Sequence, residues 1–358
     1  MSVFIGAEHI ISPIGVGAEL NFNKAFKGFS GVAKIEKAGF RDEVLFMSSF
    51  QNSDHIPTIF ELIKQLIDEL VVAPEVIESD KTKVIVSSTK GDISNGVQGA
   101  LQRIVTFIQN TYALVHQPTL ISNACISGVQ AINLAADYID SGSFKHVIVI
   151  GCDVLSTFVI NGFQSLYAIS EAPCQPYDEQ RTGINLGEAC AAVVLSNDNN
   201  IYKGKPLQYL GGSTTNDANH ISGPSRTGEG LYRSVKQSLE RAKIDSNSIG
   251  YISAHGTATR FNDDMESIAF NRLGMNLVPL NSLKGYFGHT LGTAGIIETA
   301  MAMQSLKQQK LLKSRGCENK GTTEPISVIQ ESTNHSFDVL LKTASGFGGG
   351  NASLILSR

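Results

Sequence analysis

Cys125 lies where a short apolar segment gives way to a turn and then to a helix-like pattern. The stretch from Thr119 to Tyr138, TLISNACISGVQAINLAADY, begins strand-like, and after Gly128 its apolar residues recur at helical spacing. A thiol at the start of a helix faces unpaired backbone N–H groups and the positive end of the helix dipole. Both effects lower the pKa of a thiol, which suits a nucleophile. From this stretch alone, a small buried core cysteine is an equally good interpretation.

Two histidines far along the chain change that balance. His255 lies in YISAHGTATRFNDDME and His289 in NSLKGYFGHTLGTAGIIETA, each in a glycine-flanked turn after a strand-like run. Such a turn is a poor place for a packed core histidine. A thiol with two distant histidines is typical of an acyl-transfer site, whose partners converge in space and not in sequence. The alternative is that one or both histidines only satisfy their turns.

Five segments resemble those of the decarboxylating Cys-His-His condensing enzymes, the beta-ketoacyl-[acyl-carrier-protein] synthases of the thiolase-like superfamily. Any one segment is a weak signal, whereas five in the same order and spacing are specific. They are the nucleophile segment NACISG, the block PYDEQRTGINLGEACAAVVLS, the histidine segments AHGTAT and KGYFGHTLGTAGIIE, and the glycine-rich SGFGGGNASLIL near the C-terminus.

The resemblance implies a reaction and a role for each reactive residue. Cys125 takes an acyl group from the phosphopantetheine thioester of an acyl carrier protein. A malonyl-type extender then loses carbon dioxide, and His255 and His289 donate hydrogen bonds to the enolate oxygen. The carbanion attacks the acyl-Cys125 thioester and gives a 3-oxoacyl product. The reaction implied in this way uses no metal and no further cofactor.

The glycine-rich segment around Phe347 has two implied roles. By resemblance, the backbone N–H groups of Phe347 and Cys125 form the oxyanion hole, and the Phe347 side chain is a gate on the acyl pocket. The surrounding glycines allow the close backbone approach that this requires. The alternatives are a tight hairpin turn for the segment and a core aromatic for Phe347.

Four charged residues are implied to support the histidines. Lys284 resembles the family lysine behind the histidines, where it orders the electrostatics around His289 together with Glu298. Asp263 and Glu266 are three residues apart, so that they can share one helix face in a supporting role. An acidic pair that only favours the N-terminus of a helix is an equally good interpretation of these two carboxylates.

The chain also departs from the family pattern. Tyr177 and Ala189 replace the phenylalanine and glycine of the family's Pro-Phe-Asp and Gly-Glu-Gly elements. The N-terminal half is short between about residues 30 and 120, a region that shapes the acyl tunnel and the dimer contact in relatives. Within the same block, the spacing of Asp178 and Arg181 predicts a structural ion pair across a turn.

Composition indicates a globular protein whose main partner is not a nucleic acid. Of 358 residues, 42% are hydrophobic and 17% are charged, and the net charge is −4. The five cysteines are scattered without a C-x2-C pair, which disfavours zinc and a disulfide framework and suits a reducing compartment. Glu8 and His9 interrupt the first apolar run, so we expect neither a signal peptide nor a membrane span. A cytoplasmic protein is the resulting expectation.

Strand-like and helix-like segments alternate through the whole chain. This alternation predicts an α/β fold of mostly parallel sheets covered by helices on both faces. Because the strand-turn-helix at Cys125 has a counterpart at His289, we expect two halves. Residues 1–200 carry the nucleophile, and residues 201–358 carry both histidines. The resemblance implies the thiolase-like fold, in which duplicated α/β halves form a five-layered αβαβα sandwich.

Three functions remain open from the sequence. The leading one is an elongating ketosynthase that serves fatty-acid or polyketide and polyene synthesis. A thiolase would need a second cysteine in the glycine-rich segment, and an initiating synthase would have asparagine in place of His289. A non-catalytic, chain-length-factor-like partner of a heterodimeric ketosynthase is disfavoured, because the nucleophile and both histidines are intact. The family implies a dimer. The first option is a homodimer, and the second is a heterodimer with a related ketosynthase-like subunit.

Overall fold

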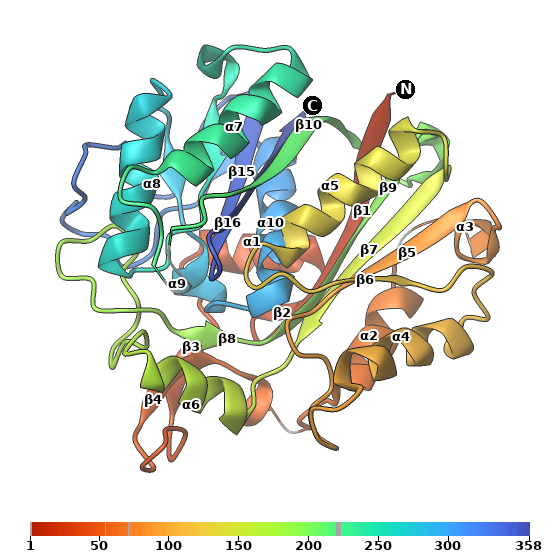
Figure 1. Ribbon diagram of the computed structural model, residues 1–358, viewed down its shortest axis with the longest axis horizontal. Helices are drawn as coiled ribbons and strands as arrows, with labels where there is room; N and C mark the ends of the chain where they lie inside the picture. The colour runs from red at the N-terminus through yellow and green to blue at the C-terminus, as the bar shows by residue number, and fades with distance from the viewer. Residues whose placement is uncertain (1, 54, 71, 73, 220–222) are drawn as a thin grey trace.

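The computed structural model describes residues 2–53, 55–70, 72, 74–219 and 223–358 (Figure 1). Its strands are β1 (Val3–Ser12), β2 (Gly15–Val16), β3 (Val32–Ile35), β4 (Leu45–Ser48), β5 (Thr82–Ser87), β6 (Thr119–Ile121), β7 (His146–Asp153), β8 (Leu186–Gly187), β9 (Ala189–Ser196), β10 (Leu207–Asn216), β11 (Tyr251–Ser253), β12 (Leu280–Asn281), β13 (Lys310–Leu311), β14 (Thr333–Asn334), β15 (Val339–Gly346) and β16 (Gly350–Ser357). Its α-helices are α1 (Ala18–Phe26), α2 (Ile59–Asp68), α3 (Pro74–Glu78), α4 (Ala100–Thr111), α5 (Ser127–Asp140), α6 (Thr157–Ser165), α7 (Glu229–Ala242), α8 (Arg260–Arg272), α9 (Lys284–Phe287) and α10 (Ala294–Gln308).

The main sheet repeats one strand order in its two halves. The order is β12-β11-β15-β16-β10-β1-β9-β7-β5-β6. Each half contributes five strands to this order. Outward from β1, the first of the five in the N-terminal half, lie the fifth (β9), fourth (β7), second (β5) and third (β6) in chain order. The same order runs outward from β10, the first strand of the C-terminal half. We propose that these are the two duplicated halves expected from the sequence, residues 1–200 and 201–358.

The half-sheets are mixed, and they join edge to edge. Parallel pairing is found at β5–β6, β5–β7, β11–β12 and β11–β15, whereas β7–β9, β1–β9, β15–β16 and β10–β16 pair antiparallel. The expectation of mostly parallel sheets is therefore wrong, because in each half the last strand turns back between the fourth and first strands. β15 and β16, for example, form a hairpin. β1 and β10 pair at Val3–Tyr209, Phe4–Gln208 and Ile5–Leu207, which joins the half-sheets.

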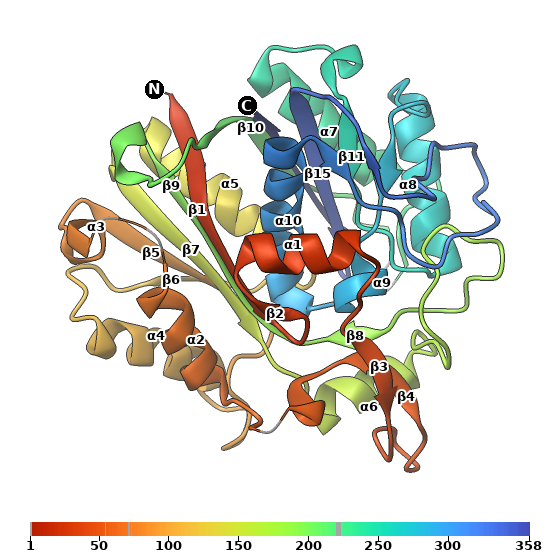
Figure 2. The same cartoon turned by 180° about the vertical axis from the view of Figure 1, so that it is seen from behind.

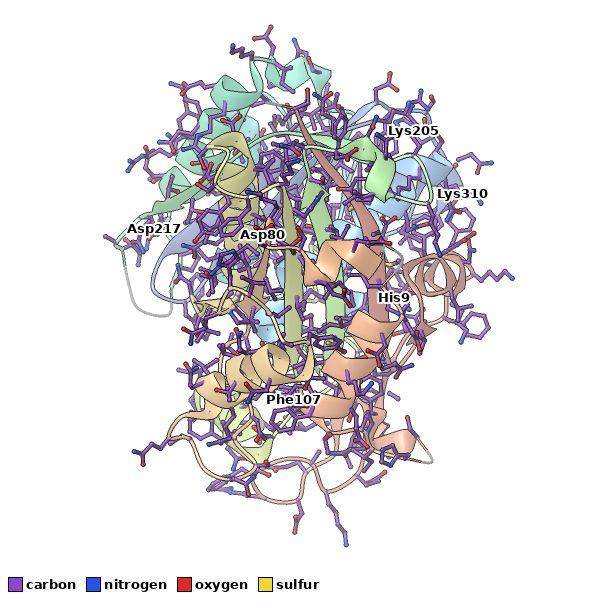
Figure 3. The ribbon with its side chains drawn as sticks, turned by 90° about the vertical axis from the view of Figure 1, so that its right-hand side faces the viewer. His9, Asp80, Phe107, Lys205, Asp217 and Lys310 are labelled. Atoms are coloured by element: carbon purple, nitrogen blue, oxygen red, sulfur yellow. The ribbon has the colours of Figure 1, made fainter. Side chains whose placement is uncertain are left out.

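Helices cover both faces of each half-sheet and complete the five layers. α2 and α4 cover the outer face of the N-terminal half, α7 and α8 cover that of the C-terminal half, and α5 and α10 lie between the two (Figure 1). Figure 2 shows α1 lying across α10 on the opposite side of the molecule from α5. In the outer layer, Phe107 of α4, labelled in Figure 3, packs on Phe60 of α2 with ring centroids 5.0 Å apart.

Strand β9 shows how the side-chain alternation of a strand serves two layers. The residues that face the central helices are Ala189, Ala191, Val193 and Leu195, and those that face the outer core of the N-terminal half are Cys190, Ala192 and Val194. All of them are fully buried. A strand buried on both faces reads as a continuous apolar run, which is the pattern the sequence has there.

The two central helices touch through glycines near their first turns. A Cβ atom added at Gly128 of α5 would lie 2.9 Å from the Cα of Gly295 in α10, and one at Gly295 would lie 2.5 Å from the backbone nitrogen of Val129. Only glycine allows backbones to approach this closely. The contact sets the two strand-turn-helix units of the halves face to face.

Within the described part of the chain, no helix combines the length and the hydropathy needed to cross a membrane.

Candidate active site

Cys125 sits in a tight turn between β6 and α5. The hydroxyl of Ser127 accepts a hydrogen bond from the backbone N–H of Asn123 at 2.7 Å and donates one to the carbonyl oxygen of Ala124 at 2.7 Å. Ala124 itself adopts a left-handed conformation, with φ of 45°. α5 begins at Ser127, two residues after the cysteine. The thiol therefore stands at the helix entrance, as the small residues of this segment predicted.

His289 is held by its backbone, which leaves its ring free to face the sulfur. Its N–H donates to the carbonyl oxygen of Asn185 at 2.7 Å, and its carbonyl oxygen accepts from the N–H of Gly187 at 3.0 Å. Gly288 precedes it with φ of 63°, and a Cβ there would lie 2.3 Å from the carbonyl oxygen of Leu186. Residues 185–187, which belong to the block PYDEQRTGINLGEACAAVVLS, thus hold the His289 turn in place.

His255 follows the carboxyl end of β11 and is also fixed through its backbone. The carboxylate of Glu266 in α8 accepts hydrogen bonds from the N–H groups of His255 at 2.8 Å and Gly256 at 2.7 Å. From the other side, the ammonium group of Lys284 donates to the carbonyl oxygen of His255 at 3.0 Å. An acidic and a basic residue therefore clamp the turn that carries the imidazole.

The three predicted reactive side chains come together from both halves of the chain. The Nε2 atom of His289 lies 2.9 Å from the Sγ atom of Cys125. The rings of His255 and His289 meet edge to face, with centroids 5.4 Å apart. Reactive atoms of all three residues lie within 4.8 Å of one another, and each residue is buried. The site is thus a compact, buried group of one thiol and two imidazoles.

Burial dominates the protonation of this group. It raises the pKa of the Cys125 thiol to about 11, although Lys284 and the backbone N–H groups of Phe347 and Cys125 act in the opposite direction. The expectation of a lowered thiol pKa is therefore wrong. Burial, and after it the charge of Lys284, holds the pKa values of His255 and His289 well below the ordinary value. At neutral pH the site contains a neutral thiol beside neutral imidazoles.

Glu298 of α10 lies behind the histidines and binds two lysines. Its carboxylate makes an ion pair with Lys284, the residue predicted to lie there, and a second one with Lys342 of β15 at 2.7 Å. Both lysines are fully buried and Glu298 is 3% exposed. The cluster therefore carries two buried positive charges against one negative charge, close to the imidazoles.

Asp263 and Glu266 share the inner face of α8, as their spacing predicted. Asp263 accepts hydrogen bonds from the backbone N–H groups of Tyr177 at 2.8 Å and Thr257 at 2.9 Å. The Tyr177 hydroxyl donates to Glu266 at 2.9 Å. Burial raises the pKa of Asp263 to about 7. The negative charge of the nearby Glu266 also raises this pKa, whereas Arg181 lowers it. The two carboxylates thus hold the backbone around His255. They do more than favour the N-terminus of α8, which was the alternative interpretation of this pair.

The predicted Asp178–Arg181 ion pair is not formed. Arg181 instead approaches Asp263 at 3.7 Å and pairs with Asp264 at 2.8 Å, both on α8. The Asp178 carboxylate accepts the backbone N–H groups of Glu318 and Asn319. The reason is tertiary: each side chain finds a partner from the C-terminal half, which the local spacing cannot reveal.

The glycine-rich hairpin brings a second backbone N–H group to the sulfur. A Cβ added at Gly346 would lie 3.1 Å from the backbone nitrogen of Cys125. The backbone N–H groups of Phe347 and Cys125 both point to the thiol. The Phe347 ring is 37% exposed and stacks on that of Phe163 in α6, with centroids 5.8 Å apart. We propose that the two N–H groups form the oxyanion hole and that the Phe347 ring is the gate of the acyl pocket.

One thiol and two imidazoles are also ligands that bind zinc in proteins. Two fully buried lysines beside them oppose a further cation at the same place. We therefore assign no metal to this group.

The comparisons with known proteins agree with this geometry. Residues 208–318 match the family described as "Beta-ketoacyl synthase, C-terminal domain", and residues 121–207 match "3-Oxoacyl-[acyl-carrier-protein (ACP)] synthase III". The chain is 31% identical over 250 residues to 3-oxoacyl-[acyl-carrier-protein] synthase 2 of Rhizobium meliloti, covering 66% of this chain and 59% of that protein. It belongs to the beta-ketoacyl synthase family.

Further relatives of this beta-ketoacyl synthase family member come from polyketide synthesis. The tetracenomycin polyketide synthase ketoacyl synthase alpha subunit of Streptomyces glaucescens is 28% identical over 254 residues, which cover 67% of this chain and 60% of that protein. The matched region thus spans about three fifths of the length of these curated relatives.

Solved ketosynthase structures share the fold over the full chain. A chain of the ketosynthase ApeO in complex with its chain length factor ApeC, from Xenorhabdus doucetiae, aligns with a TM-score of 0.86 and 25% identity. That alignment covers 99% of this chain and 98% of the other. A beta-ketoacyl synthase from Burkholderia phymatum aligns with a TM-score of 0.87 and 22% identity over 100% and 99% of the two chains. The thiolase-like ketosynthase fold expected from the sequence is confirmed.

Sequence reasoning missed two residues of this family member's site. Lys342 stands in the strand before the glycine-rich turn, where its charge directly after the apolar residues 339–341 was a detectable signal. Tyr177 was noted only as a departure from the family pattern. Its hydroxyl group, which phenylalanine lacks, is the part of the side chain that reaches Glu266.

Proposed function

We propose that this chain is a 3-oxoacyl-[acyl-carrier-protein] synthase, an acyltransferase that forms carbon–carbon bonds in fatty-acid or polyketide synthesis. The observation that carries the proposal is the buried group of Cys125, His255 and His289, with the thiol 2.9 Å from an imidazole nitrogen. An acyl-transfer nucleophile needs such an adjacent base when its own pKa is high.

The first half-reaction loads the enzyme. The Cys125 sulfur attacks the thioester carbonyl of an acyl carrier protein while its proton passes to His289 Nε2. The tetrahedral oxyanion is held by the backbone N–H groups of Cys125 and Phe347. Collapse of the intermediate breaks the bond to the phosphopantetheine sulfur, which takes the proton from His289. The acyl group then remains on Cys125.

The second half-reaction extends the acyl group. A malonyl thioester loses carbon dioxide, and the electron pair of the broken bond becomes an enolate. Neutral His255 and His289 can each donate a ring N–H to the enolate oxygen, and their low pKa values keep them neutral. The enolate carbon attacks the acyl-Cys125 carbonyl and the sulfur leaves as thiolate. A proton from solvent then restores the thiol. Lys284, Glu298, Asp263 and Glu266 hold the histidine turns during these steps.

Two alternative functions are less well supported. The match to synthase III over residues 121–207 favours an initiating enzyme, but that type has asparagine where this chain has His289. A non-catalytic, chain-length-factor-like subunit is compatible with the fold. It does not explain why thiol, imidazoles and supporting ion pairs are all assembled.

The proposed partner is an acyl carrier protein that delivers both substrates. We further propose a homodimer, with a heterodimer as the alternative, because one similar structure contains a ketosynthase with its chain length factor. A cytoplasmic location is supported by the five cysteines, which are all free and buried thiols.

The proposal is tested by intact-mass analysis of the protein after incubation with acyl- and malonyl-carrier proteins. We expect an acyl adduct on the wild type, followed by a 3-oxoacyl product. Cys125→Ala should form neither, because the attacking sulfur is absent. Cys317→Ala, which removes another buried thiol, is the matched control and should behave as the wild type.

No adduct on the wild type with any acyl chain would overturn the stand-alone enzyme. The same incubation would then be repeated with a related ketosynthase-like subunit. An adduct that appears only in the mixture would favour a heterodimer.

A further inference from the structure

Lys342 is a fully buried lysine to which the sequence resemblance assigns no role. It lies on β15, opposite Ser253 of β11 and Leu354 of β16. Its neighbours at alternate positions, Leu340 and Ala344, face the central layer. Lys342 therefore projects toward α10, and Glu298 of α10 meets its ammonium group. A lysine is almost never fully buried unless it is paired.

The ammonium group connects two parts of the site. It lies 2.7 Å from Glu298 and donates to the carbonyl oxygens of Ser253 at 3.2 Å and Ala254 at 3.4 Å. Ser253 is the last residue of β11, and Ala254 links it to His255. Lys342 thus ties the start of the His255 turn to Glu298, while Lys284 ties its end to the same carboxylate.

The ammonium group also changes the charge balance. The charged groups that face it are Glu298 from α10, Lys284 from α9 and Glu266 from α8. Glu298 is shared between the two lysines, and Glu266 is engaged by the His255 turn and Tyr177. Two ammonium groups and two carboxylates therefore meet beside the imidazoles, and the charge of Lys342 is one of those that lower the pKa of both His255 and His289.

We propose that Lys342 is a positioning residue of the site, which holds the His255 turn and adds buried positive charge beside the two imidazoles. The added charge keeps both rings in the neutral form that can donate an N–H. It also favours the anions of the proposed reaction, the malonyl carboxylate and the enolate. This second role rests on the proposed function, whereas the effect on the histidines does not.

The first test measures the histidines of the free protein. Resonances of ¹³C-labelled histidine rings, assigned with His255→Ala and His289→Ala, are titrated in the wild type and in Lys342→Met. Methionine keeps most of the side-chain volume but removes the charge. We expect both site histidines to titrate about one pH unit higher in Lys342→Met, because a cation no longer opposes their protonation. Lys236→Met, an exposed lysine on α7, should leave both titrations unchanged.

A double variant separates charge from packing. Lys342→Met with Glu298→Gln removes one charge of each sign, so the balance beside the histidines returns to that of the wild type. We expect the histidine titrations to return toward their wild-type values, and this holds even if the single Lys342 variant does not fold. An unchanged titration in Lys342→Met, or a double variant that titrates like Lys342→Met, would overturn the proposal.

Turnover distinguishes this proposal from the proposed function. In an active enzyme, the acid limb of the pH profile of 3-oxoacyl formation should move upward with the histidines in Lys342→Met. A uniform loss of rate with an unmoved acid limb would indicate a structural role only and would contradict the proposal. If the wild type makes no 3-oxoacyl product, the proposed function fails, while the histidine titration still decides the role of Lys342.

Discussion

At Cys125, the proposed nucleophile, burial and the helix entrance act on the thiol in opposite directions. The helix end and two backbone N–H groups favour a thiolate, but Cys125 is only 7% exposed, and burial raises the pKa of its thiol to about 11. In the proposed reaction the sulfur therefore depends on His289, whose Nε2 atom is near enough to take its proton. In this mechanism the thiol is protonated at rest and transfers its proton to His289 as the sulfur attacks.

The alkylation of Cys125 should depend steeply on pH. Because a raised pKa leaves the thiol protonated below about pH 11, the rate of alkylation by iodoacetamide should rise roughly tenfold per pH unit above neutrality. Peptide mass spectrometry of the Cys125 peptide measures this rate. A plateau reached below pH 8 would instead show a thiolate–imidazolium pair, and its loss in His289→Ala would identify the imidazole responsible.

The elements that matter most are the two central helices, because each begins beside a reactive turn. α5 follows Cys125, and α10 follows His289 and carries Glu298. Their crossing at Gly128 and Gly295 fixes the distance between the two turns. A change in this crossing would therefore disturb stability and the site together.

Gly295→Ala should destabilise the protein and slow any acyl transfer. Its Cβ would lie 2.5 Å from the backbone nitrogen of Val129, so the helices must separate. We expect a loss of about 1–3 kcal/mol in the free energy of unfolding, the usual cost of overpacking. Urea unfolding measures the loss.

Gly162→Ala in α6 is the matched control, because a Cβ there meets nothing within 4 Å. Alanine favours a helix over glycine, so this variant should be neutral or more stable by up to about 1 kcal/mol. Equal effects of the two substitutions would contradict the role of the central crossing.

At the scale of the whole molecule, the two halves share one core layer and one sheet. The central core contains residues of both halves, and the half-sheets join at β1 and β10. The site lies where the halves meet: Cys125 comes from one, and His255 and His289 come from the other. Neither half alone can bury its central helix.

The separate halves, residues 1–200 and 201–358, should therefore not fold cooperatively. Val129 and Ile132 of α5, which are fully buried in the whole chain, would be exposed in the N-terminal half. We expect each half to bind a hydrophobic dye and to unfold without a sharp transition, and a mixture to regain a cooperative transition by circular dichroism. Sharp transitions in both isolated halves would show two independent domains instead.

Much of the site was predictable because its residue types are local signals. Cys125 at a strand-turn-helix boundary, glycine beside each histidine and the run of glycines around Phe347 are all visible in short segments. The alternation of strand-like and helix-like segments indicated sheets covered on both faces, and the order of elements indicated two similar halves. These features depend on periodicity and turn chemistry, which a few neighbouring residues determine.

The tertiary structure decided the pKa values and the ion-pair partners, because both depend on groups that are far apart in the sequence. The pKa of the thiol depends on how completely the fold removes water, and that burial reverses the effect of the helix end. Arg181 pairs with an acidic residue of α8 and not with Asp178. Lys342 and Lys284 pair with the same carboxylate, that of Glu298. In both cases a long side chain reaches a partner that is distant in the sequence. The sequence thus determined which candidate groups the site contains and in what order they occur along the chain. Only the packed structure decided their charges and partners, since desolvation and Coulomb interactions depend on distances in space.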